Sequence, residues 1–375
     1  MKFVFFYHSL VSDWNHGNAH FLRGVVSELL DRGHRVDVFE PEDAWSVENL
    51  VRDHGTQPLD DFHRAFPHLR STRYSLEGLD LDAVLDGADV VIVHEWSHPD
   101  LVRRVGRHRE RTGSYRLFFH DTHHRAATAP EQMAAYDLEH YDGVLAYGNV
   151  IREIYLKRGW ARHAWTWHEA ADVRTFRPRP RGKPDGDVVW IGNWGDDERS
   201  AELHEFLIDP VRGLHLRACV YGVRYPPEAL DSLQRANIRY GGWLPNWRVP
   251  EIFSRYRLTV HVPRRPYVTA LRGIPTIRPF EALACAIPLI SAPWNDAEHL
   301  FTPGADYLVA HDGREMKKLM QAVIEDRPLA QRLATYGLQT ILQRHTCAHR
   351  VSELLKIVQQ LGAAACASPS TPAVS

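Results

Sequence analysis

The sequence predicts an α/β protein built from two parallel-sheet domains. Short apolar runs alternate with amphipathic helical patterns in both halves of the chain, as expected for parallel strands joined by helices. A segment rich in proline, glycine and charged residues occupies residues 171–187, and the alternation begins again after it. With 375 residues, the chain is long enough for two domains of ordinary size. We therefore expect two domains joined by a linker at residues 171–187.

Composition narrows the class of protein. Hydrophobic residues make up 44% of the chain and charged residues 25%, which is typical of a globular protein. The net charge of −2 gives no electrostatic basis for nonspecific binding to nucleic acids or membranes. The four cysteines show neither CxxC nor metal-ligand spacing, which favours a reduced, cytoplasmic protein. No apolar run approaches the roughly 20 residues of a membrane span, so no transmembrane segment is expected.

The first domain is expected over residues 1–170. Its strands are predicted at short apolar runs, at residues 3–7, 35–39, 89–93, 116–119 and 143–147. An amphipathic helix is predicted at 19–31, whereas 41–80 show little periodicity and are expected to form one or two helices with loops. Ligands of parallel sheets bind outside the carboxyl ends of the strands, so polar clusters there are candidate site residues. Such clusters follow three of the strands, at residues 8–18, 94–96 and 120–124.

The second domain is expected over residues 188–345. Its first strands are predicted at residues 188–191, 214–221, 238–240 and 258–262. Helices are predicted between and after them, at 198–207, 227–235, 250–256, 312–325, 328–343 and 346–361. Residues 362–375 are rich in alanine, serine and proline and are expected to form a disordered tail.

Residues 273–296 are predicted to form a loop, a short helix, a tight bend and a buried strand. Thr276 is a candidate N-cap, and Pro279 lies in the first turn, where a missing N–H costs little. Glu281 falls in or beside the apolar stripe of this helix. An unpaired carboxylate there would be unfavourable, so we expect Glu281 to have a specific hydrogen-bonding partner. The free N–H groups at the start of the helix suit phosphate binding.

Residues 279–291, Pro-Phe-Glu-Ala-Leu-Ala-Cys-Ala-Ile-Pro-Leu-Ile-Ser, resemble the nucleotide-sugar signature of glycosyltransferase family 4 and related GT-B enzymes. The opening at residues 8–18 and the run His120-Asp121-Thr122-His123 resemble the CgeB-like (spore maturation protein) glycosyltransferases. The resemblance implies the GT-B fold, with two Rossmann-like domains facing across a cleft and the helix at 346–361 crossing back to the first domain. It also implies a UDP- or GDP-sugar donor, no permanently bound cofactor and no metal.

The resemblance assigns the donor mainly to the second domain. Glu281 is expected to bind the ribose hydroxyls, and residues 241–245 the nucleobase. Diphosphate contacts are expected from arginine side chains and from backbone N–H groups, and Asn193 lies in a glycine-containing loop suited to phosphate. The remaining donor-binding candidates of this domain are Arg224, Trp243, Leu244, Arg264, Arg265, Gly273 and Ile274.

The first domain is expected to hold the acceptor and part of the donor sugar. By resemblance, His120 and Asp121 are expected in the catalytic site, where His120 contacts the donor sugar near its reacting carbon. Gly17 and Asn18 would expose backbone N–H groups to the cleft. Asp13 and His16 are the titratable groups of the same loop that would serve as a base or anchor the acceptor.

Several alternatives stay open at this point. Family 4 enzymes often carry a second glutamate eight residues before Glu281, but Gly273 occupies that position here. Retention of configuration is expected from the family, and inversion with a base at residue 13 or 16 is the alternative. A sugar-nucleotide epimerase and an inactive nucleotide-sugar-binding protein are alternative functions. The acceptor can be a polysaccharide, a protein, a modified nucleic acid or a small metabolite, and the sequence does not indicate an oligomeric state. The histidines at 120–124 lack HExxH-type spacing, so no metal site is expected.

Overall fold

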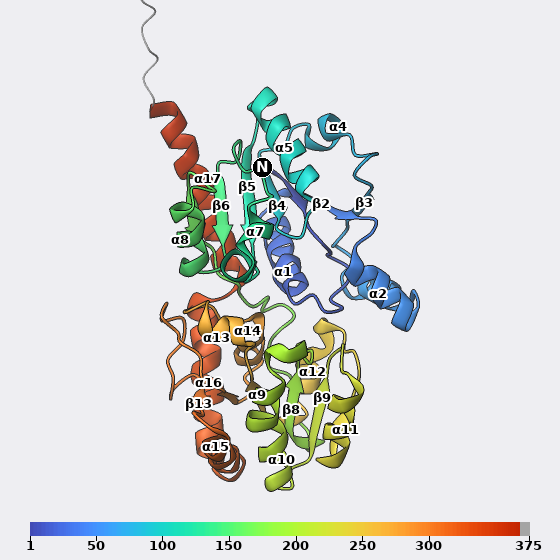
Figure 1. The fold of residues 1–375 in the computed structure, drawn as a ribbon, viewed down its shortest axis with the longest axis vertical. Helices are drawn as coiled ribbons and strands as arrows, with labels where there is room; N and C mark the ends of the chain where they lie inside the picture. Colours follow the sequence, from blue (N-terminus) through green and yellow to red (C-terminus); the bar gives the residue numbers. More distant parts are fainter. Residues whose placement is uncertain (368–375) are drawn as a thin grey trace, which may run out of the picture.

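The computed structural model describes residues 1–367 and consists of two α/β domains, one above the other along the long axis of the molecule (Figure 1). The first domain contains a seven-stranded parallel sheet, in the order β3-β2-β1-β4-β5-β6-β7. Its strands are β1 (Lys2–Phe6), β2 (Arg35–Pro41), β3 (Thr72–Tyr74), β4 (Val90–His94), β5 (Arg116–Asp121), β6 (Gly143–Ala146) and β7 (Ala164–Thr166). Its helices are α1 (Asn18–Asp31), α2 (Trp45–His54), α3 (Gln57–Ala65), α4 (Leu81–Leu85), α5 (Pro99–Thr112), α6 (Arg125–Thr128), α7 (Pro130–Met133) and α8 (Asn149–Lys157).

The second domain contains a six-stranded parallel sheet, in the order β10-β9-β8-β11-β12-β13. Its strands are β8 (Gly186–Ile191), β9 (Ala218–Tyr221), β10 (Ile238–Tyr240), β11 (Tyr256–His261), β12 (Leu289–Ser291) and β13 (Leu308–Val309). Its α-helices are α9 (Ser200–Leu203), α10 (Asp209–Gly213), α11 (Pro227–Arg235), α12 (Val249–Phe253), α13 (Arg265–Thr269), α14 (Ile277–Ala284), α15 (Gly313–Glu325) and α16 (Arg327–Arg344). Shorter helical segments are η1 (Asp196–Glu198), η2 (His204–Ile208) and η3 (Asn246–Arg248).

Both sheets have the strand order of a doubly wound fold, so each has a switch point where the order reverses. In the first domain it lies between β1 and β4, and in the second between β8 and β11. The prediction of two parallel-sheet domains is thus confirmed. Ligands are expected at the carboxyl ends of these central strands.

The central strands match the sequence-based expectation most closely because they are continuous buried apolar runs. Val90–His94 is buried along its whole length, as is Ala218–Tyr221. β3 and β7 were not predicted from the sequence; they are three-residue strands at opposite edges of the first sheet. The strand expected at 214–221 starts only at Ala218, because α10 occupies the chain to Gly213 and His215 has a positive φ of 54°. Such short or irregular segments lack the length that makes periodicity readable.

The last helix, α17 (Cys347–Ala367), crosses from the second domain to the first and packs against α1, as Figure 1 shows. Cys347, Val351 and Leu354 are buried in one apolar core with residues of β1 and α1. Gly24 permits this close approach, because a Cβ there would lie 2.7 Å from Asp172 Cβ and would also meet the Cys347 sulfur. The helix extends six residues beyond the predicted 361, and residues 368–375 of the expected tail lie outside the described part of the chain.

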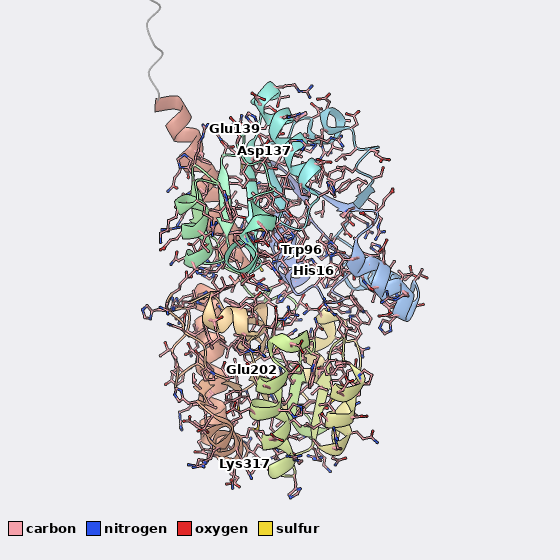
Figure 2. All side chains as sticks on the ribbon, viewed as in Figure 1. His16, Trp96, Asp137, Glu139, Glu202 and Lys317 are labelled. Atoms are coloured by element: carbon pink, nitrogen blue, oxygen red, sulfur yellow. The ribbon has the colours of Figure 1, made fainter. Side chains whose placement is uncertain are left out.

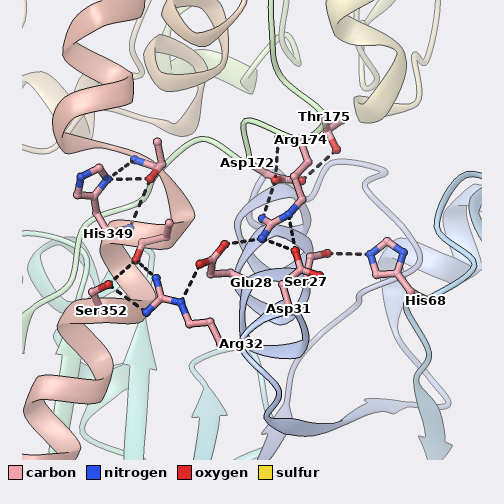
Figure 3. A network of polar contacts seen from close by, with 12 residues as sticks. Ser27, Glu28, Asp31, Arg32, His68, Asp172, Arg174, Thr175, His349 and Ser352 are labelled. Atoms are coloured by element: carbon pink, nitrogen blue, oxygen red, sulfur yellow. Dashed lines mark hydrogen bonds and ion pairs between the residues drawn. The ribbon is translucent and has the colours of Figure 1, made fainter.

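A polar network fixes α1 between the linker and α17 (Figure 3). Arg174, in the linker, pairs with Glu28 and lies 2.7 Å from the carboxylate of Asp31. Arg32, the C-cap residue of α1, donates to the carbonyl of Ala348 at 2.9 Å. The linker and the crossing helix are therefore both anchored to α1, which begins at the domain boundary. None of the helices in residues 1–367 has the length and apolar composition needed to cross a membrane.

Candidate active site

A cavity of about 690 Å³ lies between the two domains, at the carboxyl ends of both sheets. Its first-domain wall is formed by loops after β1, β4 and β5 and by the start of α2. Its second-domain wall is formed by loops after β8, β9, β10 and β11 and by the start of α14. The first-domain wall supplies Asp13, Trp14, Asn15, His16, Gly17, Asn18, Trp45, Asn49, Trp96, Thr122, His123, Tyr147 and Glu169. The main second-domain residues are Asn193, Arg199, Arg224, Trp243, Leu244, Asn246, His261, Arg264, Tyr267, Thr276 and Arg278.

The second-domain wall is strongly cationic. Four arginines line it, namely Arg199, Arg224, Arg264 and Arg278, and among its described lining residues there is no acidic side chain. Arg199 is held by backbone carbonyls, including that of Val262 at 3.0 Å, and burial lowers its pKa to about 9. Arg264 lies 3.4 Å from the carboxylate of Glu198. The excess of positive charge suits a ligand with two or more negative charges.

Two helix N-termini meet at this cavity. Gly17, the N-cap of α1, lies against the first residue of α14, because a Cβ at Gly17 would be 3.2 Å from Ile277 Cγ2. Neither helix has a side-chain cap or an acidic residue in its first turn. Arg278 is the second residue of α14, where the helix dipole disfavours a cation. An anion bound between these N-termini would offset both the dipoles and this positive charge.

Glu281 lies behind the second-domain wall. Its side chain is fully buried and accepts hydrogen bonds from His20 Nδ1 at 2.8 Å and Asn246 Nδ2 at 2.7 Å, and it pairs with Arg278. Burial opposes its ionisation, but Arg278, His20 and Asn246 together lower the pKa of the Glu281 carboxyl. The expectation of specific partners is confirmed. The carboxylate does not line the cavity, whereas Arg278 and Asn246 do.

The tautomer of His20 follows from its two partners. Its Nε2 accepts the backbone N–H of Asp172 at 2.9 Å, so Nδ1 carries the proton and donates to Glu281. The ring also stacks on Phe176, with 4.0 Å between ring centroids. A first-domain helix, the linker and α14 are thereby joined through one buried imidazole.

The first-domain wall is aromatic and carries no lysine or arginine among its described lining residues. Trp45 and Trp96 are half-buried, and their rings lie 6.1 Å apart at 74°. His16 is buried, and its Nε2 has no partner within the described residues. Burial, followed by the charges of His8 and Arg23, holds the pKa of His16 well below its usual value. His16 is therefore neutral at pH 7.

Asp13 lines the cavity and connects the two domains. Its carboxylate accepts from Arg23 at 2.9 Å, from the Trp243 indole N–H at 3.2 Å and from the Asn246 backbone N–H at 3.1 Å. The ion pair with Arg23 is almost fully buried. A second connection runs from Asn193 to Asn15. Asp13 is thus the centre of an interdomain contact rather than an unengaged carboxylate.

His120 and Asp121 lie beneath the first-domain wall and do not line the cavity. Both belong to β5 and are fully buried, and His120 Nδ1 is 2.5 Å from the Tyr7 hydroxyl. Burial lowers the pKa of His120 to about 3 and raises that of Asp121 to about 6. The residues that reach the cavity from this strand are the next two, Thr122 and His123.

Three other expected donor-binding residues lie outside the cavity. Arg265 is exposed at the start of α13 and pairs with Glu202 at 2.9 Å. The backbone N–H of Gly273 donates to Asn295 O at 2.6 Å, and that of Ile274 donates to Leu271 O at 3.2 Å. Because both amides are already bonded, the expectation that they hold the diphosphate does not fit this structure. The side chain of Ile274 instead packs into the first-domain core.

Glu169 is a cavity residue that was not predicted from the sequence. It lies just before the linker, and its buried carboxylate accepts from Asn18 Nδ2 at 3.3 Å. Burial raises the pKa of Glu169 to about 8, and the nearby Glu281 adds to this effect. The group is therefore mostly protonated at pH 7.

The cavity residues Arg199, His261 and Arg278 were also not predicted from the sequence, although Arg278 directly precedes the segment that carries the resemblance, residues 279–291. In the described residues, no group of His, Cys, Asp or Glu is arranged to hold a metal ion.

Residues 199–356 match the family model described as "Glycosyl transferase-like". None of the curated proteins compared matches the chain. Among solved structures, sucrose-phosphate synthase from Thermosynechococcus elongatus superposes with a TM-score of 0.66 at 15% identity, over 97% of this chain and 100% of that one. HepE from Anabaena in complex with UDP gives 0.68 at 13%, over 96% and 100%. An alpha-glucosyltransferase in complex with UDP-glucose and DNA containing an abasic site gives 0.68 at 12%, over 96% and 99%.

The chain has the GT-B fold. These similarities extend over both domains, in agreement with two facing Rossmann-like sheets. The fold expected from the resemblance is thereby confirmed. The glycosyltransferase-like region begins at Arg199 and contains the other three arginines of the cationic wall. The GT-B protein therefore carries its glycosyltransferase-like segment on the cationic side of the cavity.

Proposed function

We propose that this protein is a metal-independent glycosyltransferase that moves a sugar from a nucleoside-diphosphate sugar to a hydroxyl of an acceptor. The cationic second-domain wall carries this proposal, because its four arginines face the same cavity as two uncapped helix N-termini. A departing nucleoside diphosphate accumulates negative charge as the glycosidic bond breaks. Preorganised cations and helix dipoles stabilise such charge without a divalent ion. The resemblance to CgeB-like and family 4 enzymes supports the same activity.

UDP-sugars are the preferred donors in this proposal, with GDP-sugars as the alternative. The printed descriptions of HepE and the alpha-glucosyltransferase name UDP or UDP-glucose as their ligands. Trp243 and Leu244 would pack near the nucleobase, and Asn193, Arg224 and Arg264 would contact the diphosphate. All five line the cavity. No permanently bound cofactor is needed for this chemistry.

Arg278 is the residue that links Glu281 to this function. The ribose contact expected of Glu281 requires a carboxylate oxygen at the cavity surface, whereas Glu281 points to Arg278, His20 and Asn246. We therefore assign Glu281 a positioning role, in which it holds Arg278 and Asn246 toward the donor. His120 is assigned a similar role beneath the wall, since His123 reaches the cavity from the same segment.

The reaction proposed here retains the configuration of the sugar. The acceptor oxygen forms a bond to the anomeric carbon as the bond from that carbon to the diphosphate breaks. The proton of the acceptor hydroxyl passes to the departing diphosphate oxygen, so no protein base is required. The engagement of Asp13 with Arg23, Trp243 and Asn246 supports this route over one with Asp13 as base.

A thermal-shift screen with UDP, GDP, ADP, CMP and dTDP, each with EDTA, tests the proposal first. A ligand that binds only the folded state at about 100 times its Kd raises stability by about 2.7 kcal/mol. We expect UDP to raise Tm in EDTA, and UDP-sugars to be slowly hydrolysed. If no nucleotide raises Tm, the proposal is wrong. Nucleotide binding without hydrolysis or transfer would instead favour the inactive binding protein, and release of an epimerised sugar would favour the epimerase.

A further inference from the structure

The two walls of the cavity differ in charge, and this difference bears on the acceptor. All arginines among the described lining residues belong to the second domain, and the first-domain wall supplies tryptophans, histidines and asparagines. Its carboxyl groups are Asp13, which pairs with Arg23, and Glu169, which lies just before the linker. A phosphorylated or otherwise polyanionic acceptor would find no cation on this wall. The wall therefore suits an uncharged acceptor.

Trp45 and Trp96 form an aromatic corner on this wall. Their rings lie 6.1 Å apart and nearly perpendicular, at 74°. His8 stacks on one face of the Trp45 ring at 4.4 Å, and Arg125 covers one face of Trp96 at 4.1 Å. The described rings of Trp14, His16 and Trp96 meet Trp45 only at steep angles, from 72° to 81°. Figure 2 shows Trp96 and His16 at the boundary between the domains.

The corner is held in place before any ligand binds. Ser46 donates its backbone N–H to His8 Nε2 at 3.3 Å, which fixes the ring that supports Trp45. Arg125 pairs with Glu95 and donates to its carbonyl at 2.7 Å, so the charge behind Trp96 is compensated. Both indoles are half-buried and line the cavity. Preorganised aromatic surfaces of this kind bind a ring at little cost in side-chain entropy.

The same wall carries polar atoms without protein partners, and one of them belongs to His16, whose ring contacts Trp45. His16 Nε2 and Asn18 Oδ1 are buried atoms that form no hydrogen bond within the described residues. Both residues line the cavity. A buried polar atom without a partner costs about 1–3 kcal/mol, so a ligand that supplies one is favoured. A neutral imidazole and an amide oxygen suit hydroxyl groups. The wall thus combines apolar ring faces with hydroxyl-binding atoms.

We infer that the acceptor is an uncharged carbohydrate, whose sugar ring packs in the corner of Trp45 and Trp96 and whose hydroxyls bond to His16 and Asn18. The C–H face of a sugar ring is apolar and its rim is polar, which matches this distribution of groups. The inference rests on the proposed function, since it names the substrate of the same site. It excludes nucleic acids and phosphorylated polymers as the principal acceptor.

Two measurements separate this inference from the proposed function. The first titrates intrinsic tryptophan fluorescence with a neutral set of maltotriose, cellotriose and chitotriose, with and without UDP. The second measures UDP release from UDP-glucose and UDP-N-acetylglucosamine with these oligosaccharides, and separately with single-stranded DNA and with hyaluronan fragments. We expect at least one neutral oligosaccharide to change the fluorescence and to accelerate UDP release. Acceleration only by DNA or by the acidic fragments would overturn the inference.

The variants Trp45→Ala and Trp96→Ala locate the effect. We expect the oligosaccharide KM to rise about tenfold in each, as the loss of one aromatic contact implies. The Kd of UDP should change less than about twofold, because neither residue belongs to the cationic wall. Trp160→Ala is the matched control, since Trp160 is also half-buried under an arginine, Arg158 at 5.0 Å, but does not line the cavity. An equal KM change in the control would overturn the assignment to the corner.

The outcomes remain distinguishable when one of the two ideas fails. Oligosaccharide binding that depends on Trp45, without any UDP binding, would overturn the proposed function and keep a carbohydrate site. UDP binding and donor hydrolysis without any oligosaccharide-dependent signal would keep the proposed function and overturn the inference. Circular dichroism of each variant verifies that it folds, and Trp45→Phe provides a milder change that keeps an aromatic face.

Discussion

The two walls of the cavity occupy equivalent positions in their domains but differ in charge. Each is formed by loops at the carboxyl ends of a doubly wound parallel sheet. The second-domain wall carries four arginines, whereas the first-domain wall carries tryptophans, neutral histidines and no cation among its described lining residues. The strand order thus determines where a ligand binds, and the loop residues determine which ligand binds there. Charge is concentrated where a diphosphate would leave.

The walls are joined by a few buried polar contacts, and Glu281 is the centre of one of them. It accepts from His20 of the first domain and from Asn246 of the second, and it pairs with Arg278. These contacts hold α1 and α14 with their N-termini together. Any variant that breaks them should affect both walls.

The largest effect is expected for Glu281→Ala. Removal of this carboxylate leaves Arg278 without its anion and removes the acceptor of His20 and Asn246, so we expect a loss of about 3–5 kcal/mol in the free energy of unfolding. Denaturant titration in the absence of nucleotide measures it. Glu325→Ala, on the exposed part of α15, should leave the free energy nearly unchanged. A loss below about 1 kcal/mol for Glu281→Ala would contradict the assigned role.

Arg264→Gln, compared with Arg265→Gln, tests the cationic wall directly. The two arginines are neighbours in the chain, but only Arg264 lines the cavity. Loss of a charge-assisted contact to the diphosphate should weaken UDP binding by about 1.5–3 kcal/mol, or about 10- to 150-fold in Kd. Isothermal titration calorimetry with UDP gives this value. Equal effects of the two substitutions would show that general surface charge, and not the cavity wall, attracts the nucleotide.

Glu169, at the junction of the walls, should make both stability and UDP binding depend on pH. Burial raises its pKa from an ordinary value of 4.5 to about 8 in the folded protein. Its contribution to stability is therefore full below pH 4.5 and is lost as the pH rises to about 8, with a slope of at most about 1.4 kcal/mol per pH unit. Above pH 8 its negative charge should also weaken UDP binding. Glu169→Gln should flatten both profiles. If the wild-type and variant profiles are parallel between pH 5 and 9, Glu169 is ionised at neutral pH and this account is wrong.

The sequence predicted the central strands and the edge of the sheet where the site lies, but it did not predict which side chains face the cavity. The strand expected at 116–119 left His120 and Asp121 in the following loop. In the structure β5 continues through Asp121, and His120 is paired in register with His94 of β4 and Leu145 of β6. Because β5 is two residues longer than expected, the loop that follows it begins at Thr122, and Thr122 and His123 line the cavity in place of His120 and Asp121. The hydrophobic periodicity of a sequence does not locate the end of a strand to within two residues.

The cationic wall was harder to predict for a different reason. Arg199 is far in sequence from the segment at 273–296 and comes to the cavity only through tertiary packing. Arg278 lies within that segment, three residues before Glu281, but its role depends on the close approach of α1 and α14 at Gly17 and Ile277. A single sequence shows which residue types these loops contain, but it does not show which loop residues lie close together in the folded protein. The cavity residues of the loop at 8–18, which includes Asp13, were predicted from the sequence because this loop directly follows the first strand.

The smallest effect is expected for His16→Ala, and it separates the two roles that a histidine on the neutral wall can have. If His16 Nε2 only bonds to an acceptor hydroxyl, the acceptor KM should rise by about 2- to 10-fold, as for a loss of 0.5–1.5 kcal/mol, with kcat nearly unchanged. If His16 is instead the base of an inverting reaction, kcat should fall by about 10²–10⁴-fold, and the product should have the opposite anomeric configuration from the donor. Because its pKa lies well below 6.5, acceptor binding through His16 should not vary between pH 7 and 8. Steady-state kinetics with the acceptor and NMR of the anomeric proton decide between these roles, and a retained anomer with unchanged kcat leaves the neutral wall as a binding surface.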